Sequence, residues 1–450
     1  MPLGDELKAL ADGIQTEDGC REAILDGLAE IIAGEDIAKQ VLFYSGLTTR
    51  LLKKLPVFLM GKSQRGKSFC MTQVGSLLFA RVFEDITSMS PKTIYYETKQ
   101  KGNPALYKNK IALLDEFNDR PDDLKTFVKM WISHKGGPLR HKTVDTKAKE
   151  KFLEFEVEGV PVFWTNSMEL VEDVGNQIHN RFFKLNVDEN LAQSKTVEEW
   201  QIQEETTGSA IDPRVLRKGQ MAVDYILERG DFQILNPFAA FITQKDYSVF
   251  NRRPMLNALL GAVTYSNWRW RPSYEVEDRK ILLASLWDNL KALELWNRNE
   301  VYQQLAIPDY LKKVLDVLDL EFGLTKVEIA TAYREKHGQK ISAGTCYNYA
   351  KKLEEKDLAT SKHREDDDGK SRGLEWTSTM STITSVELDP ALSPEKLADR
   401  LRLVFVEVTL PSTIDPEEEI ARIIPILMDA DIPTKEFGTG DKAKQGILEV

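Results

Sequence analysis

Residues 61–68 read Gly-Lys-Ser-Gln-Arg-Gly-Lys-Ser and match the spacing GxxxxGK[ST] in full. The two fixed glycines allow the backbone to fold its N–H groups around phosphate oxygens. Lys67 places a cation at the β- and γ-phosphates of a nucleotide, and the Ser68 hydroxyl suits Mg²⁺. A helix that begins near Gly66 adds the positive end of its dipole. The stretch therefore predicts a phosphate-binding loop, whose contacts come from Gly61, Lys62, Ser63, Gln64, Arg65, Gly66, Lys67, Ser68 and Phe69.

Three apolar runs have a similar form. The first directly precedes this loop, and the other two come later in the chain. They cover residues 55–60, 111–116 and 160–166, and each ends in polar residues or glycine. Continuous apolar runs of this length are typical of strands in a parallel sheet that is covered on both faces. Helical patterns lie between them, so the first half of the chain is predicted to be α/β.

Asp115 and Glu116 close the second of these runs. At a strand end near a phosphate-binding loop an aspartate holds Mg²⁺, so Ser68 and Asp115 are the predicted metal ligands. An adjacent glutamate can polarise the attacking water as a general base. Asn166 closes the third run, which is expected to lie between the other two strands, and its amide can orient the same water. The alternative is that these are ordinary strand-end residues.

Arg181 precedes a further apolar run, residues 182–185. An arginine at this place can reach the γ-phosphate of a nucleotide held by a neighbouring subunit, where it would stabilise transition-state charge. An ordinary surface arginine is the alternative. The predicted catalytic set consists of Lys67, Asp115, Glu116, Asn166 and Arg181.

The series GKSQRGKS, IALLDE, VFWTN and NRFF resembles an AAA+ ATPase, in particular the superfamily 3 and MCM-like replicative helicases of viruses and plasmids. The resemblance covers about residues 25–320 and makes Asn166 the residue called sensor 1. It implies ATP and Mg²⁺ as cofactors and a homo-hexameric ring. It also implies that ATP hydrolysis drives translocation along single-stranded or forked duplex DNA, with replication proteins as further partners.

In that family a hairpin just before sensor 1 points basic residues into the central pore. The matching stretch, residues 134–151, holds six lysines and arginines against two acidic residues, in a chain whose net charge is −11. Phosphate binding requires a cationic surface of this kind. The alternative is a solvated charged hairpin. The predicted DNA contacts on it are Lys135, Arg140, Lys142, Lys147 and Lys149.

A second nucleotide contact is implied further along the chain. Arg252 and Arg253 stand before Pro254 at the start of a strong helical pattern, residues 255–270. Proline suits the first turn of a helix. In MCM-like proteins an arginine that opens such a lid helix touches the nucleotide, and either arginine could do so here. Surface arginines without this role are the alternative.

Residues 325–356 have the pattern of a helix-turn-helix. Thr325 and Glu328 form a capping box that opens the first helix, and Gly338 ends it. Ser342 can cap the second helix. The expected inward face of that helix consists of Cys346, Ala350 and Leu353. Its outward face offers donors to phosphates and base edges, and the predicted DNA contacts there are Tyr347, Asn348, Lys351 and Lys352.

Two strands, expected at residues 358–362 and 374–377, complete a winged helix-turn-helix. Residues 322–376 hold eleven lysines and arginines against ten acidic residues, so this unit has little net charge. Because winged helices also serve as protein-contact modules, both DNA and a partner protein stay open as its ligand.

Composition limits what else the chain can be. Of its 450 residues 42% are hydrophobic, enough for a core, which excludes wholesale disorder. The net charge of −11 excludes a protein that coats nucleic acid, so DNA must meet a local basic patch. Three cysteines without a CxxC pair make a disulfide framework or zinc cluster unexpected. No apolar run approaches the ~18 residues of a membrane span. We therefore expect a soluble, cytoplasmic protein without membrane contact.

The predicted architecture is an AAA+-like P-loop NTPase sheet with a helical lid, followed by the winged helix-turn-helix and a small C-terminal domain. In the last domain, residues 403–408 resemble a strand and residues 417–428 a helix. The predicted units are an N-terminal helical segment (1–45), the ATPase core (46–200), the lid and linker (201–320), the winged helix (321–378) and the accessory domain (379–450).

The leading functional prediction is an ATP-dependent, ring-forming DNA helicase or translocase that acts in the replication of a mobile element. One alternative is an AAA+ switch that remodels or loads partner proteins, whose ATPase rate would not respond to DNA. Another is a DNA-binding replication initiator or regulator that uses ATP only for assembly and would not separate strands.

Overall fold

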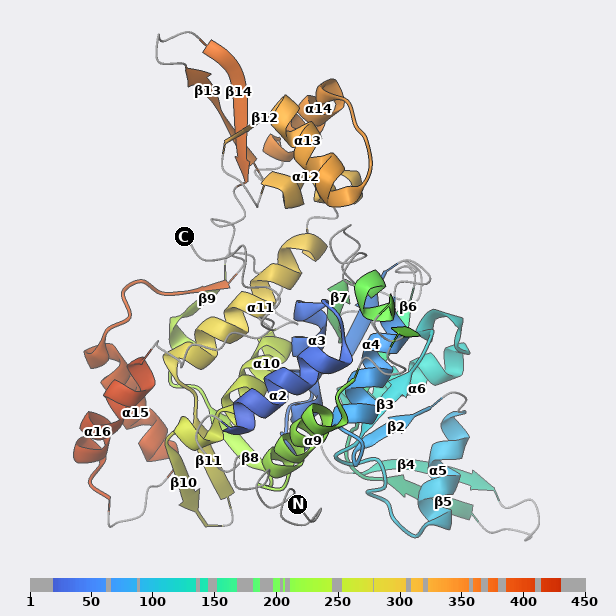
Figure 1. The fold of residues 1–450 in the computed structure, drawn as a ribbon. Coiled ribbons are helices and arrows are strands. Elements are labelled where there is room, and N and C mark those ends of the chain that lie inside the picture. Colours follow the sequence, from blue (N-terminus) through green and yellow to red (C-terminus); the bar gives the residue numbers. More distant parts are fainter. Residues whose placement is uncertain are drawn as a thin grey trace.

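The structure is a computed structural model. Figure 1 shows a body built around a central sheet, a second region at the lower left that contains α15 and α16, and a separate unit at the top. The described residues are 19–61, 66–86, 90–134, 138–144, 152–167, 181–186, 197–202, 205–206, 211–244, 253–277, 279–304, 309–318, 323–355, 359–365, 371–378, 386–408 and 414–429.

A five-stranded parallel sheet forms the centre of the body. Because β6 pairs with β1 on one side and with β3 on the other, the strand of Asn166 separates the P-loop strand from the strand that ends before Asp115. The predicted α/β fold and the predicted place of the third strand are confirmed. The strand order is β2 (Phe83–Asp85), β3 (Ile111–Leu114), β6 (Val162–Ser167), β1 (Val57–Met60) and β7 (Phe183–Asn186).

Both faces of this sheet are buried, because successive side chains of a strand point to opposite faces. In β1, Val57 and Leu59 belong to one hydrophobic cluster, and Phe58 and Met60 belong to another. The first cluster includes residues of α2 (Gly19–Ile31), α3 (Asp36–Leu47), α9 (Pro213–Leu227), α10 (Arg253–Ser266) and α11 (Leu286–Gln304). The second includes residues of α5 (Pro91–Gln100), α6 (Asp122–Ser133) and the hairpin of β4 (Leu139–Val144) and β5 (Phe152–Val157).

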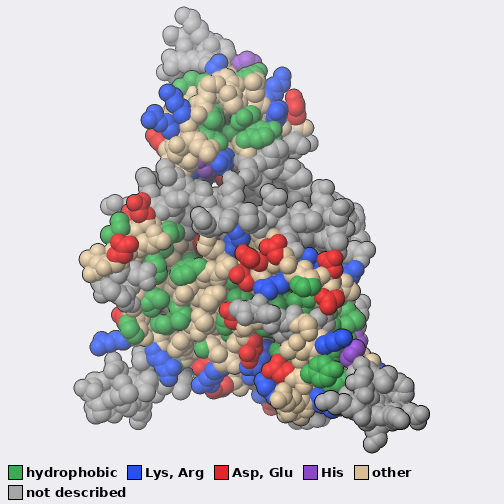
Figure 2. Space-filling model, turned by 90° about the vertical axis from the view of Figure 1, so that its right-hand side faces the viewer, with side chains coloured by type: hydrophobic (Ala, Val, Ile, Leu, Met, Phe, Trp, Pro, Cys, Tyr) green, Lys and Arg blue, Asp and Glu red, His purple; other side chains and the backbone are tan. Residues whose placement is uncertain are grey.

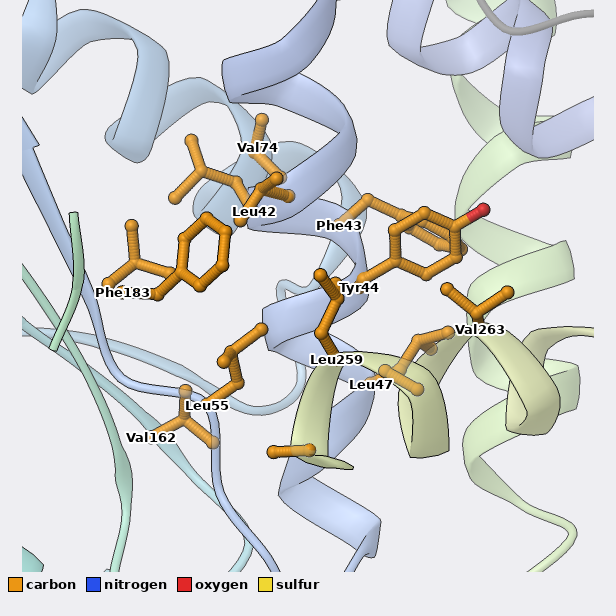
Figure 3. Packing of buried hydrophobic residues seen from close by; sticks show 14 of the residues in the cluster. Leu42, Phe43, Tyr44, Leu47, Leu55, Val74, Val162, Phe183, Leu259 and Val263 are labelled. Atoms are coloured by element: carbon orange, nitrogen blue, oxygen red, sulfur yellow. The ribbon is translucent and has the colours of Figure 1, made fainter. Parts of the chain in front are cut away.

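Helix α3 joins the sheet to α10. Its Leu42 lies beside Phe183 of β7, and its Leu47 lies toward Leu259 and Val263 of α10 (Figure 3). Burial of a side chain of this size contributes about 1.5–3 kcal/mol. Helices α2 and α3, which precede the P-loop, are therefore part of the same core as the sheet, and the predicted boundary at residue 45 falls inside α3.

The helix after the P-loop is divided. It begins as α4 (Lys67–Gln73) and continues as one π turn, η2 (Val74–Leu78). A Cβ atom at Gly75 would lie 2.2 Å from the ring of Phe83, so this close approach requires glycine. The helix predicted to begin near Gly66 is thus an α-helix followed by a π turn, which widens the helix locally.

A second sheet lies where the sequence predicted mostly helix. Its strand β8 (Phe232–Leu235) pairs in parallel with β11 (Arg279–Leu283), and β11 pairs with the antiparallel β10 (Ser273–Val276). These strands have only four or five residues. A period-two pattern this short does not stand out beside the long apolar stripes of α9 and α10, so the sequence did not indicate it.

The last part of the described chain packs onto this second sheet. Helices α15 (Pro394–Val408) and α16 (Pro416–Met428) share a hydrophobic cluster with Tyr274 and Ile281. In addition, β15 (Val386–Leu388) pairs with β9 (Ile242–Gln244). The chain therefore returns to the body after the upper unit.

The strand predicted at residues 403–408 is wrong, because these residues are the last turns of α15. The side chains that α15 buries, Leu397, Leu401 and Phe405, stand at helical spacing along one face. The short apolar run hid that longer period. The helix predicted at residues 417–428 is confirmed by α16.

Residues 309–378 form the unit at the top of Figure 1. The predicted capping box of Thr325 and Glu328, the C-cap at Gly338 and the N-cap at Ser342 are confirmed, and so is the predicted buried face of the second helix. Three helices, α12 (Asp309–Leu318), α13 (Lys326–His337) and α14 (Ala343–Glu354), pack with an antiparallel sheet of β12 (Leu324–Thr325), β14 (Ser371–Ser378) and β13 (Ala359–Glu365).

A buried ion pair fixes the start of α11 to the segment after α10. Arg271 donates to both carboxylate oxygens of Asp288, at 2.6 and 2.8 Å. Asn267 and the backbone N–H of Ser285 donate to the same carboxylate, at 3.1 and 2.9 Å. The Asp288 side chain is fully buried, so removal of any of its acceptor oxygens leaves a donor without a partner.

We expect Asp288→Ala to lower the free energy of unfolding by about 3–5 kcal/mol, because it leaves the Arg271 guanidinium buried without its carboxylate. Urea denaturation followed by tryptophan fluorescence measures this loss. The matched control is Glu294→Ala on the same helix, which removes a partly exposed ion pair with Lys291 and should cost less than about 1 kcal/mol. Similar losses for the two variants would contradict the role of the buried pair.

Candidate functional site

The phosphate-binding loop joins β1 to α4. Gly66 has a φ of +75°, a left-handed conformation that favours glycine. Lys67 is the first residue of α4 and is buried, and its Nζ donates to the carbonyl of Gly61 at 2.7 Å. This bond joins the two described ends of the loop and holds the ammonium group beside Gly61. The four residues between, Lys62, Ser63, Gln64 and Arg65, lie outside the described residues.

Three polar side chains from three elements meet next to Lys67. The Ser68 hydroxyl donates to Asp115 Oδ1 at 2.8 Å. Asn166 Nδ2 donates to Ser68 Oγ at 3.2 Å and also to Asp115 Oδ1. Because β6 lies between β1 and β3, its buried Asn166 touches both neighbours at once. The structure thus brings Lys67, Ser68, Asp115 and Asn166 to one end of the sheet.

Glu116 lies at the same end of the sheet and has an unusual backbone conformation. Its φ is +51°, which is left-handed and costs about 1–2 kcal/mol for a residue other than glycine. The Glu116 N–H donates to Asn166 Oδ1 at 3.1 Å, and its side chain is exposed. Strained residues of this kind concentrate at functional sites. The turn that strains Glu116 leaves its carboxylate outside the sheet, open to solvent.

Arg120 supports this turn, and the sequence did not single it out. Its Nε and Nη2 both donate to the carbonyl of Asp115, at 2.9 and 2.7 Å. The Thr165 hydroxyl donates to the carbonyl of Leu114, the preceding residue, at 2.5 Å. An arginine five residues after an aspartate has no recognisable motif, so only the fold reveals that it fixes the backbone of the site.

The donors at the site fit a Mg²⁺–nucleotide complex. In such sites Mg²⁺ takes one or two protein oxygens and completes its shell with water and phosphate oxygens. Ser68 and Asp115 supply two such oxygens, 2.8 Å apart, next to the buried Lys67. Among the described residues no group of three or more His, Cys, Asp or Glu side chains could enclose a metal by itself.

Arg181 lies at the opposite end of the sheet, where the parallel strands begin. It precedes β7 by two residues, and Phe183 of β7 pairs with Val57, the first residue of β1. The loop begins at Gly61, four residues further along β1, which is ~13 Å at about 3.3 Å per residue. The half-buried Arg181 donates through Nε to the hydroxyl of Ser133, the last residue of α6. It therefore stands apart from the P-loop of its own chain.

The second predicted arginine contact is described only in part. Arg253 begins α10 and its Nη2 donates to the carbonyl of Ala239 at 2.9 Å. Arg252 lies outside the described residues. The structure therefore shows Arg253 attached to a neighbouring backbone turn rather than to the cluster around Ser68.

An aromatic pair lies beside the loop, and the sequence indicated only one of its members. Phe69, predicted as a nucleotide contact, is 44% exposed, and its ring lies 6.1 Å from that of Trp200 in an edge-to-face arrangement. The Trp200 indole N–H is buried without a hydrogen-bond partner. Trp200 follows a long polar stretch, so nothing in its local sequence indicated that it would reach α4.

The basic hairpin is present as β4 and β5. Arg140 pairs with Glu156 at 2.9 Å and Lys142 pairs with Glu154 at 3.4 Å, across the two strands. The described base of the hairpin is therefore charge-balanced, and both cations are largely exposed. Lys135, Lys147 and Lys149 lie outside the described residues.

On the upper unit one predicted contact residue, Tyr347, is half-buried against the sheet. The Tyr347 ring packs edge-to-face on the buried Trp376 at 5.3 Å, which corrects its predicted place on the outward face. Tyr347 follows the buried Cys346 directly, which puts it at the margin of the outward face, and Trp376 of β14 covers that margin. Asn348, Lys351 and Lys352 are exposed as predicted.

Comparison with known proteins agrees with this geometry. Residues 11–219 match the family model described as the MTBMA_p00010 P-loop domain, a stretch that includes all five strands of the central sheet. The chain therefore contains a P-loop domain, which implies nucleotide binding and NTP hydrolysis, typically with Mg²⁺. No curated protein matches the chain. None of the helices in the described part of the chain is long and apolar enough to span a membrane.

Proposed function

We propose that this P-loop protein is an ATP-dependent DNA helicase or translocase of the AAA+ type, which assembles as a ring and acts in DNA replication. Lys67 would bind the β- and γ-phosphates, and Ser68 and Asp115 would bind Mg²⁺, which neutralises phosphate charge when bound. Glu116 would accept the proton of the attacking water while Asn166 orients that water.

The observation that carries the proposal is the position of the β4–β5 hairpin. Strand β5 ends at Val157 and β6 begins at Val162, so only residues 158–161 separate the hairpin from the strand of Asn166. The Trp131 indole donates to the carbonyl of Gly159 at 2.8 Å and anchors that short link. A force on the hairpin would therefore be transmitted along β6 to Asn166, the side chain that touches Ser68 and Asp115.

The place of Arg181 supports assembly into a ring. Because Arg181 lies at the end of the sheet opposite its own loop, it can reach a γ-phosphate only if that nucleotide belongs to another subunit. A contact in which one surface meets a different surface of the next copy is heterologous, and such contacts form a ring when the rotation from copy to copy closes. We take the hexamer as the ring size that the AAA+ resemblance implies.

The upper unit supports a DNA contact. Its helix, turn, helix and antiparallel hairpin have the order of a winged helix-turn-helix. Seen from the right-hand side of Figure 1, this unit shows Lys and Arg side chains on both flanks, with Asp or Glu side chains beside them (Figure 2). Asn348, Lys351 and Lys352 would place donors against phosphates and base edges.

The test is the variant Lys142→Ala/Lys147→Ala in the hairpin. We expect basal ATPase near wild type, because neither lysine belongs to the nucleotide site. DNA stimulation of the ATPase and separation of a forked duplex should both fall, because backbone phosphates lose their cations. The log–log salt slope of DNA binding should be smaller by about one for each phosphate that the variant no longer neutralises.

The matched control for the hairpin is Lys101→Ala. Lys101 is an exposed lysine just after α5, the helix that packs on β5, and it is paired with Glu97. This variant should retain DNA stimulation. Unchanged unwinding by a correctly assembled Lys142→Ala/Lys147→Ala ring would remove the reason for placing DNA at the hairpin.

A second candidate is an AAA+ switch that remodels or loads partner proteins. The charge balance of Arg140 and Lys142 with Glu156 and Glu154 favours it, because a neutral surface suits a protein better than DNA. If the ATPase rate of the wild-type chain does not respond to DNA, this second function takes the place of the first.

A further inference from the structure

A group of basic and aromatic side chains lies near the start of β1, at the end of the central sheet opposite the phosphate-binding loop. We call it the basal cluster. Arg50 and Lys54 precede β1, Arg229 follows α9, and Arg269 lies in the short helix after α10. All members are half-buried rather than exposed. The basal cluster consists of Arg50, Lys54, Tyr225, Arg229, Trp268 and Arg269.

The fold brings these segments together through backbone contacts. Leu51 forms a parallel β-bridge with Phe232, which sets Arg50 beside the turn that contains Arg229. The Tyr265 hydroxyl donates to the carbonyls of Ile226 and Gly230, at 2.8 and 3.0 Å, and fixes that turn. Burial raises the pKa of the Tyr265 phenol, and Arg50 and Arg229 both oppose that rise. Both guanidinium groups are thus near the same phenol.

Two aromatic rings hold the arginines in place. The Arg229 Cζ lies 4.0 Å from the centre of the Tyr225 ring and 5.0 Å from that of Trp268. The Arg269 Cζ lies 4.9 and 5.5 Å from the same two rings. Stacking of this kind stabilises the face of a guanidinium, but its N–H groups still need acceptors at the edge.

Two arginines of the basal cluster each have a buried donor without an acceptor, whereas Arg269 Nη2 donates to the Tyr225 hydroxyl. The Nε atoms of Arg50 and Arg229 are buried without a hydrogen-bond partner. With the amide of Asn109 turned so that its oxygen faces Arg50, that oxygen accepts from Arg50 Nη1 at 3.2 Å. Lys54 Nζ donates to the carbonyl of Thr49 at 2.7 Å. Buried donors without acceptors cost free energy, so the cluster is incomplete as it stands.

Neighbouring carboxylates do not supply the missing acceptors. Asp224 and Glu228 pair with Arg81, and Glu158 pairs with Lys108. Asp231 acts on Lys54 over a distance, yet among the described residues no ion pair joins it to Arg50, Lys54 or Arg229.

Lys54 shows the effect of this imbalance. Its burial lowers its pKa to about 8, the repulsion of Lys108 and Arg50 adds to that change, and Asp231 opposes it. A cation under this strain gains from an anion beside it. In a chain of net charge −11, a half-buried group of positive charges with spare donors indicates a ligand of opposite charge.

We propose that the basal cluster binds phosphate oxyanions, supplied by a polynucleotide backbone or by a free phosphate. A phosphate group offers several acceptor oxygens on one centre, and the planar fork of arginine matches their geometry. A carboxylate has fewer oxygens to share among three or four cations. The site would be separate from the phosphate-binding loop, since it lies at the opposite end of the sheet.

The test uses the full chain with Lys67→Ala, so that the phosphate-binding loop does not mask the result. Titration calorimetry with pyrophosphate and fluorescence anisotropy with labelled oligothymidylate are the two arms. Arg50→Gln and Arg229→Gln, added singly, should each weaken pyrophosphate binding about tenfold or more, because each removes a charge-assisted hydrogen bond. The matched control is Arg279→Gln, which removes an exposed arginine of β11 and should change little.

The two arms distinguish the sources of the phosphate. An equal loss for oligothymidylate assigns the site to backbone phosphates, and a loss for pyrophosphate alone assigns it to free phosphate. Arg229→Lys should retain part of the affinity, because the charge stays while the planar fork does not. If the glutamine variants do not fold, a rise in melting temperature of the Lys67→Ala chain with pyrophosphate, cancelled by Lys54→Gln, carries the test. Binding that is absent, or equally weakened by Arg279→Gln, would overturn the proposal.

Discussion

Lys67→Ala is expected to abolish ATP turnover, with a loss of about 10²–10³-fold or more, while the chain stays folded. Lys67 is buried between the two ends of the loop, and its ammonium group lies 2.7 Å from the Gly61 carbonyl. A cation at this place stabilises the negative charge that develops on the transferred phosphoryl group, and a single oriented donor is worth about 10²–10³ in rate. A phosphate-release assay at saturating ATP measures the loss.

The control is Lys92→Ala on α5, which removes an exposed lysine outside the site and should hydrolyse ATP at the wild-type rate. Alanine favours helices, so the start of α4 should remain intact in Lys67→Ala. Circular dichroism and the melting temperature verify that. Wild-type hydrolysis by folded Lys67→Ala would refute the assignment of the loop.

Arg181→Ala is expected to reduce ATPase activity about 10³–10⁵-fold, the effect of an arginine supplied to a neighbouring active site. Because Arg181 lies at the end of the sheet opposite its own loop, mixing two kinds of inactive subunit should restore part of the ATPase activity. Arg181→Ala subunits retain Lys67, and Lys67→Ala subunits retain Arg181. In a ring mixed in equal parts, about one quarter of the interfaces pair an intact loop with an intact arginine.

The measurement is the ATPase rate of mixtures over a range of ratios, with co-assembly verified by pull-down of differently tagged subunits. Partial recovery at intermediate ratios supports the trans role. No recovery in rings that contain both subunits would mean that Arg181 acts within its own chain or has no role in hydrolysis. Arg400→Ala, an exposed arginine of α15, is the matched control and should remain active alone.

Much of the nucleotide site could be predicted because its elements are local in the chain. The loop is contiguous, and its glycines, lysine and serine each have a fixed chemical task. Asp115 and Asn166 close apolar runs of the kind that is typical of strands buried on both faces. Helix caps at Thr325, Gly338 and Ser342 were predictable for the same reason, since each depends on residues within one turn.

Other features could not be read from local patterns. Arg120 binds the carbonyl of Asp115, and Trp200 packs on Phe69 across the start of α4. The run at residues 403–408 resembles a strand in the sequence, yet it is part of α15. This helix packs on a sheet whose strands come from much earlier in the chain. Such outcomes depend on which surfaces meet, and short windows contain no record of that.

The sequence by itself thus determined the phosphate-binding loop, the α/β class and the local helix boundaries, because these follow from backbone freedom, hydrophobic period and capping over a few residues. Only the tertiary structure decided that Asn166 touches both Ser68 and Asp115. It also decided that Arg181 lies at the end of the sheet opposite the loop, and that the cations of the basal cluster lie together. Those relations join residues far apart in the chain. Strand order and packing set them, since they fix distances that sequence spacing leaves free.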